Sequence, residues 1–333
     1  SASWELDLWG RVRASVKRER LRAEAEAGNY HNVLLSLQAS LAQQYFAHCA
    51  AHTELSLLQR SNDLAAENLE MQKARLRMGQ GVQAEVANAQ LELQNAATAL
   101  EASRRNTGRL LHAIAELTET IPSELSNLEP ALLPGIPDIP VGLPSDLLAL
   151  RPDLLAADRR LRSAALQVGI RKANFLPQIS LVGGGGIASL KADNLFAADS
   201  TLFDLGPEVD IGIFQYRLRK AAVAQAKAQF REAAANFKAA FLTAVKEVDD
   251  ALLDARSYSR EITLQRQALQ AATEAAEAAR KRFDTGLTNY FDFIAAERVR
   301  LQTAARESTL TSERLLATVR LIQALGGSWP SGK

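Results

Sequence analysis

Apolar side chains recur at spacings of three and four residues from Gly10 to Met78, a stretch that contains no proline. This periodicity predicts one nearly uninterrupted helix. At 1.5 Å per residue its length approaches ~100 Å, far beyond a helix of a globular domain. The stretch from Tyr216 to Phe283 repeats the design and is rich in alanine, which allows close helix contact. The pattern therefore predicts walls made of long helices that lie side by side.

Each long helix is followed by a glycine-containing turn and a shorter helical segment. A turn at Gly81 leads into Val82–Glu119, and a turn at Gly286 leads into Leu287–Leu325. These segments predict two helical hairpins. An offset of 205 residues pairs Gly81 with Gly286 and indicates an internal duplication.

Three short segments alternate apolar and polar residues with a period of two, which is typical of strands. Two of them precede the long helices, and the third, Leu176 to about Ala188, should pair as a hairpin with the strand before Tyr216. Their alternation predicts one apolar face and one polar face. The apolar residues are Trp4, Leu6, Leu8, Ile179, Leu181, Val209, Ile211 and Ile213.

A proline-rich stretch between Pro122 and Pro152 predicts a broken connector between the two helical halves. A helix is predicted over 145–174, so the last proline of this stretch falls near the start of that helix. The second half thus runs helix, strand, strand and long helix, whereas the first half begins at its last strand. By this symmetry, roughly 60 residues of the first repeat are expected upstream of Ser1.

Composition narrows the possible functions. Apolar residues make up 47% of the chain but aromatic residues only 6%, which favours thin helical packing over a thick core. The net charge of +1 leaves no excess of positive charge for phosphates, so nucleic acid is not an expected partner. No run of about 18 apolar residues occurs, so any membrane crossing would be made by strands.

The predicted strands leave two interpretations open. A closed transmembrane barrel takes at least about eight strands, so several chains would have to contribute strands jointly. The alternative is a soluble sheet whose apolar face covers a core.

Other residue clusters have ordinary explanations. His48, Cys49 and His52 lack a third ligand nearby and are interpreted as helix-face residues rather than a metal site. Gly183–Gly186 fits a strand better than a phosphate cradle, because no Gly-Lys-Ser/Thr follows it. The basic run from Arg11 to Arg22 is a solvated helix face, with lipid headgroup proximity as the alternative. No catalytic set, metal site or cofactor is expected, so the chain is predicted not to be an enzyme.

Three segments carry a resemblance to a known family. The segment from Arg151-Pro152-Asp153 to Gly183 resembles the signature of the outer-membrane efflux proteins, which are TolC-like, and is most similar to their OprM-type lipoprotein branch. Residues 4–13 are similar to the family's strand-to-helix junction, and residues 324–329 resemble its usual ending. Together the three segments extend over nearly the whole chain.

This resemblance implies a mostly α fold with membrane β-strands. In a homotrimer, very long helices would form an α-helical barrel in the periplasm, and each protomer would give four strands to a shared transmembrane β-barrel. The apolar strand residues named above would face the lipid. It implies a passive export channel of a tripartite efflux system in the outer membrane of a Gram-negative bacterium. The expected partners are a periplasmic adaptor, an inner-membrane pump of the resistance-nodulation-division type and outer-membrane lipid. The alternative function is a soluble coiled-coil adaptor or scaffold.

The resemblance also implies functional residues at the hairpin tips. The adaptor would contact Gly81, Val82, Gly286 and Leu287. A periplasmic gate would use Phe291 as its apolar constriction and Asp292 as its acidic ring, whereas Ala295 stands where relatives often have a second aspartate. The alternative for Asp292 is a favourable charge near a helix start.

The expected domain organisation follows these assignments. It consists of residues 1–9 and 176–214 as barrel strands, 10–119 as the first helical hairpin, 120–144 as the proline-rich connector, 145–175 and 215–325 as helices of the second repeat, and 326–333 as a C-terminal tail.

Overall fold

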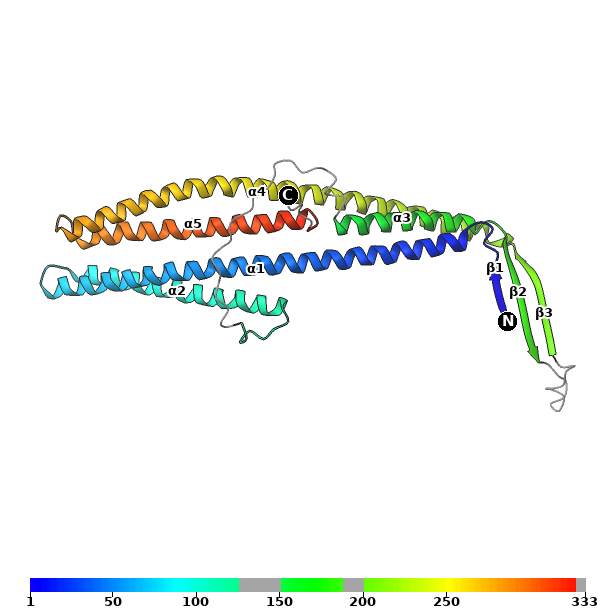
Figure 1. Ribbon diagram of the computed structural model, residues 1–333, viewed down its shortest axis with the longest axis horizontal. Coiled ribbons are helices and arrows are strands. Elements are labelled where there is room, and N and C mark those ends of the chain that lie inside the picture. The colour runs from blue at the N-terminus through cyan, green and yellow to red at the C-terminus, as the bar shows by residue number, and fades with distance from the viewer. Residues whose placement is uncertain (126–150, 188–200, 328–333) are drawn as a thin grey trace, which may run out of the picture. The chain divides into compact units, whose positions relative to one another are not determined.

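The computed structural model describes residues 1–125, 151–187 and 201–327, and this part of the chain is mostly helical (Figure 1). The helices are α1 (Arg11–Arg77), α2 (Gln83–Leu117), α3 (Pro152–Ala173), α4 (Tyr216–Asp284) and α5 (Tyr290–Ala324). The strands are β1 (Ala2–Glu5), β2 (Gln178–Ile187) and β3 (Thr201–Asp210), and a short 3-10 turn, Ile213–Gln215, precedes α4.

The two long helices are confirmed, with 67 residues in α1 and 69 in α4. Neither contains proline, so every interior amide can donate within the helix. Gly28 is the one glycine inside α1, and a Cβ there would lie 3.1 Å from both the Ala156 Cβ and the Pro152 carbonyl oxygen. This glycine therefore allows α3 to approach α1 closely. None of the described helices is both long enough and apolar enough to cross a membrane.

The first compact unit comprises Ser1–Val33 and Ser145–Val245. In it, α3 packs against the first turns of α1, and Arg159 on α3 forms a 3.0 Å ion pair with Glu24 on α1. At the start of α3, Arg151 forms a 2.7 Å ion pair with Asp153. Burial alone would raise the pKa of Asp153, but the hydrogen bond and charge of Arg151 hold that pKa below its ordinary value. Buried apolar side chains of this unit include Leu21, Ala25, Leu154, Ala156, Ile170 and Ala226.

The second unit comprises Leu34–Pro144 and Lys246–Lys333, and it contains the two predicted hairpins. Figure 1 shows α2 returning along α1, and α5 returning along α4. The return helices α2 and α5 have the same length, 35 residues. Their buried residues include Leu100, Ile114, Phe293, Leu301, Leu315 and Leu321.

The strands form one antiparallel sheet in the order β1-β2-β3. The predicted hairpin between the second and third strands is confirmed by ten consecutive residue pairs, from Gln178↔Asp210 to Ile187↔Thr201. Gly183–Gly186 lies within this hairpin, as expected of strand glycines rather than a phosphate cradle.

The strands are shorter than the alternation predicts. Leu8 lies beyond β1, because the backbone turns at Asp7, whose φ is +33°, and the Asp7 carboxylate accepts hydrogen bonds from the amides of Val12 (2.7 Å) and Arg13 (3.1 Å). Asp7 thus caps α1 instead of extending the strand. Ile211 lies beyond β3, and Ile213 begins the 3-10 turn.

The other boundary predictions have mixed outcomes. Among the described residues, helix α3 runs from Pro152, where the fixed φ of proline suits the first helical position. Helix α5 begins at Tyr290 instead of Leu287, because Asn289 is its N-cap. The expected connector beyond residue 125, the start of the helix predicted over 145–174, Ala188 and the tail beyond residue 327 lie outside the described residues.

Candidate functional sites: the sheet faces and the hairpin tips

One face of the sheet is apolar and exposed. Partner residues of neighbouring strands share a face, so the register places Trp4, Leu181 and Pro207 in one row. In the next row Ile179 pairs with Val209, and the Leu6 amide donates to the Ile179 carbonyl at 2.9 Å. Most of the predicted apolar residues therefore lie together. The same face continues to two large side chains that the sequence analysis did not single out, Phe203 (79% exposed) and Leu205 (64% exposed).

The opposite face is largely polar, although it also carries Val182 and the exposed Leu202. Glu5, Ser180 and Glu208 form one row, and Asp204 lies farther along β3, opposite Gly184. A Cβ at Gly184 would overlap the Asp204 carboxylate, so a side chain there would displace this acid from its present position. The sheet thus has one side suited to hydrocarbon and one suited to water.

The two hairpin turns have the same backbone geometry. Gly79 and Gly286 have φ of +72° and +74°, a conformation that favours glycine. Each donates its amide hydrogen to a carbonyl three residues back, at 3.0 and 2.9 Å, as in a helix-ending turn. Gly79 is therefore the counterpart of Gly286, at an offset of 286 − 79 = 207. The offset of 205, which paired Gly81 with Gly286, is wrong at the tips.

This correction changes which residues are equivalent. Helices α2 and α5 also begin 207 residues apart, at Gln83 and Tyr290. The offset of 205 would pair Asp292 with Ala87, whereas the offset of 207 pairs it with Glu85. Both hairpins therefore carry an acid in the first turn of the return helix.

The proposed gate residues surround the start of α5. Asp292 is exposed, its amide donates to the side-chain oxygen of the N-cap Asn289 at 3.0 Å, and its carboxylate accepts a hydrogen bond from the Thr288 hydroxyl. A negative charge here also faces the positive end of the helix dipole. Ala295, one turn later, is exposed. The geometry accounts for Asp292 as a helix-start residue, and its gating role stays a prediction.

Phe291 contacts the other hairpin. The Arg75 guanidinium lies over its ring, 5.0 Å from the ring centre, at a distance typical of a cation–π contact. Arg75 also donates to the Gln80 carbonyl at 3.2 Å and lies 3.8 Å from the Glu85 carboxylate. One arginine therefore connects the first tip to the predicted apolar constriction.

Two polar contacts further link the hairpins. The Tyr290 hydroxyl donates to the Glu67 carboxylate at 2.6 Å. Burial of the phenol raises the pKa of Tyr290 to about 12, and the Glu67 carboxylate shifts it in the same direction. Arg298 forms an ion pair with Glu92. Sequence reasoning missed these contacts because their partners are more than 200 positions apart and no local motif marks them.

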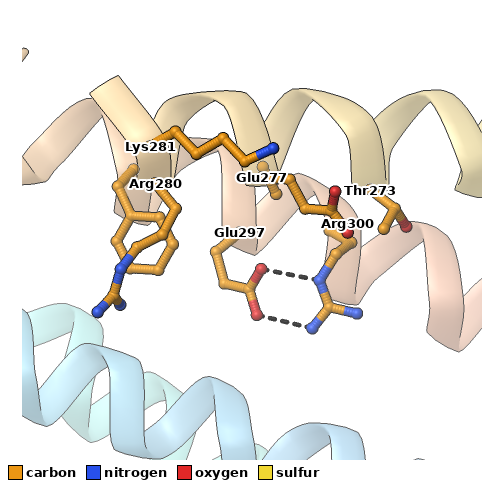
Figure 2. A pocket seen from close by; sticks show the side chains of 8 residues that line it. Thr273, Glu277, Arg280, Lys281, Glu297 and Arg300 are labelled. Carbon is orange, nitrogen blue, oxygen red and sulfur yellow. Dashed lines mark hydrogen bonds and ion pairs between the residues drawn. The ribbon is translucent and has the colours of Figure 1, made fainter. Parts of the chain in front are cut away.

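A pocket of about 450 Å³ lies between α4 and α5, close to the second tip. Figure 2 shows the buried Glu297 carboxylate accepting hydrogen bonds from Nε and Nη2 of Arg300, at 2.8 and 2.6 Å. Arg280 lies over the Phe293 ring, 5.1 Å from its centre. Glu297 and Arg300 lie one turn apart on α5, so this paired contact neutralises both charges on the α5 wall of the pocket.

The predicted adaptor-contact residues lie in and beside the two turns. Val82 is 58% exposed and Leu287 is 73% exposed, so both tips present apolar side chains. Away from the tips, His48 is buried whereas His52 is exposed, so the two imidazoles have different surroundings.

Comparison with known proteins identifies the family. The model of the family "Outer membrane efflux protein" matches residues 1–119 and 143–327. The chain belongs to this family. Among the relatives of this outer membrane efflux protein, the solvent efflux pump outer membrane protein SrpC of Pseudomonas putida is 27% identical over 330 residues, which cover 98% of the chain and 70% of SrpC. The outer membrane protein OprJ of Pseudomonas aeruginosa is 28% identical over 341 residues, which cover 99% of this chain and 69% of OprJ.

Solved structures agree with this assignment. The outer-membrane channel OprN matches with a TM-score of 0.90 at 27% identity, over 98% of this chain and 74% of OprN. The open-state outer membrane channel MtrE of Neisseria gonorrhoeae matches with a TM-score of 0.84 at 26% identity, over 98% of this chain and 74% of MtrE. The family resemblance drawn from the sequence is thereby confirmed, and a soluble adaptor or scaffold is not favoured.

Proposed function

We propose that this outer membrane efflux protein is one protomer of a trimeric, passive export duct in the outer membrane of a Gram-negative bacterium. The observation that carries the proposal is the sheet, which has an exposed apolar face on one side and carboxylates on the other. Energy for export would come from a pump, because the duct itself only conducts.

The sheet favours a barrel shared among chains. A sheet that remains open exposes unpaired backbone groups at its edges, and these cannot stay unsatisfied in hydrocarbon. Closing the sheet with strands from neighbouring copies would remove those edges. Phe203 and Leu205 would then meet lipid, and Glu208 and Asp204 would line water.

The helical hairpins would form the periplasmic part of the duct. The exposed apolar tips at Val82 and Leu287 support contact with a periplasmic adaptor that connects the duct to an inner-membrane pump of the resistance-nodulation-division type. The names of relatives point to several cargoes, since SrpC is a solvent efflux protein and CusC of Escherichia coli a cation efflux protein. A wide, water-filled duct would leave the choice of cargo to the pump.

The first turn of α5 is proposed as the closure of the duct. Three copies of Phe291 would narrow the pore, and three copies of Asp292 would form an acidic ring that attracts cations. The links from Arg75 to Phe291 and from Tyr290 to Glu67 support this assignment, because they hold the two hairpins together beside the first turn of α5.

Adjacent residues on opposite faces of β3 offer the sharpest test. Leu205→Arg places a charge on the apolar face, and an arginine near the bilayer midplane costs about 2–4 kcal/mol in each copy. Gly206→Arg is the matched control, because Gly206 belongs to the polar face and has open space for a side chain.

The amount of folded trimer in the outer membrane, measured after fractionation, should fall strongly for Leu205→Arg and stay close to wild type for Gly206→Arg. Equal assembly of the two variants would show that the apolar face does not meet lipid, and the duct proposal would fail with it.

A further inference from the structure

The first turns of α1 carry an exposed face that is both basic and apolar. This junction face consists of Val12, Arg13, Val16, Lys17 and Arg20, which line a groove of about 470 Å³ together with Leu21 and Glu24. Val16 is 65% exposed, and the side chains of Arg13 and Arg20 are 79% and 81% exposed. Two valines and three cations thus lie uncovered directly after the sheet.

Helix geometry places the junction face on the apolar side of the sheet. The Arg11 guanidinium donates to the Glu5 carboxylate, which belongs to the polar sheet face. Arg13 follows two positions later, about 200° around the helix, so its side chain leaves α1 on the opposite side. Val16 and Arg20 share that side with Arg13, since they follow at spacings of three and four residues. The junction face therefore continues the apolar side of the sheet.

The positive charge of this region is unusual for a helix start. Acids stand in the first turns of α2, α3 and α5, where they favour the helix dipole, but neither α1 nor α4 has one. Arg13 and Arg20 form ion pairs with the half-buried Asp7 and Glu24, whereas Lys17 forms no ion pair with any described residue. Asp7 caps α1 and pairs with Arg13, and Glu24 pairs with Arg20, so Lys17 is the cation of the junction face that an external anion would complement.

An exposed aromatic ring lies just before the long helix of each repeat. Trp9 precedes α1 and is 50% exposed, and its indole nitrogen donates to the Pro177 carbonyl at 2.7 Å. Phe214 precedes α4 and is fully exposed, and Arg217 and Lys220 follow it without an ion pair to any described residue. Aromatic rings beside Lys and Arg, next to an apolar surface, are typical of a membrane–water boundary.

We infer that the junction face binds the phosphate headgroups of anionic phospholipids at the periplasmic surface of the outer membrane. The valines would lie against the upper acyl chains while Lys17 and Arg20 reach the phosphates. This inference rests on the proposed function, which places the sheet in that membrane. An acidic protein surface fits less well, because the cations are interleaved with uncovered valines that continue the apolar sheet face.

The test uses the full-length trimer in detergent, mixed with equal amounts of phosphatidylglycerol and phosphatidylcholine. Native mass spectrometry gives the ratio of the two lipids retained on the trimer. The variant Lys17→Gln/Arg20→Gln removes two charges from the junction face. Arg104→Gln/Arg105→Gln is the matched control, because it removes two exposed charges from α2 in the other unit.

Wild-type protein should retain phosphatidylglycerol in preference, and Lys17→Gln/Arg20→Gln should lose about tenfold of that preference while the control keeps it. An unchanged preference in the junction-face variant would overturn the inference. The inference would also be overturned if the Lys17→Gln/Arg20→Gln trimers dissociated while the control trimers did not, because the two cations would then bind a neighbouring copy. Conductance in bilayers of neutral lipid tests the duct separately, since it should persist in both variants.

Discussion

Asp292 is a single residue whose position fits two roles. Its carboxylate accepts the Thr288 hydroxyl and favours the dipole of α5, as an acid at any helix start would. In a trimer, three such carboxylates around a narrow pore would also repel one another and attract cations. The helix-start role is local to each protomer, whereas the gating role requires the pore, so conductance separates the two.

We predict that Asp292→Ala raises single-channel conductance in planar bilayers, because the change removes three side chains from the constriction. The free energy of unfolding should fall by only about 0.3–1 kcal/mol, the usual contribution of a charge at a helix end.

Glu85→Ala is the matched control, since Glu85 occupies the equivalent first turn of α2. If both alanine variants conduct like the wild type, Asp292 serves the helix alone and the gate lies elsewhere.

At the scale of elements, the two tip turns depend on glycine. Gly79 and Gly286 adopt a left-handed backbone that costs other residues about 1–2 kcal/mol, although a Cβ at either position would meet no atom within 4 Å. The requirement for glycine is therefore conformational rather than steric.

We predict that Gly286→Ala lowers the free energy of unfolding by about 1–2 kcal/mol, measured by thermal or denaturant unfolding. Gly108→Ala is the control, because Gly108 lies inside α2 with open space around it and alanine should stabilise the helix by about 0.5–1 kcal/mol. Stabilisation by both changes would mean that the tip turn tolerates a side chain.

The helices could be predicted from sequence because their signals are long and repeated. The absence of proline and the spacing of apolar residues by three and four define α1 and α4 over more than sixty residues. One residue that breaks the pattern therefore does not change the prediction of a helix. The strand ends could not be predicted in the same way. Leu8 continues the alternation, yet Asp7 caps α1 and ends the strand, and alternation alone cannot distinguish an acid on a strand face from a helix cap.

The tips show why the candidate site was only partly predictable. The first turn contains Gly79 and Gly81 whereas the second contains only Gly286, so the sequence offers two alignments and only the backbone φ values distinguish them. Links such as Tyr290 to Glu67 join residues far apart in the chain, and single-sequence patterns do not report such contacts.

For the whole molecule, the uncovered sheet face leads to a prediction about assembly. Phe203, Leu205 and Val209 lie exposed on one face, and a protomer alone in water would leave this face and the sheet edges unsatisfied. We predict that the full-length protein is extracted from membranes only by detergent, and that it sediments there with about three times the protomer mass once bound detergent is subtracted. Heating should convert this particle to monomers, because the shared sheet would be lost cooperatively. A stable monomer in detergent-free buffer would contradict the prediction, since it would mean that the apolar face is covered within one chain.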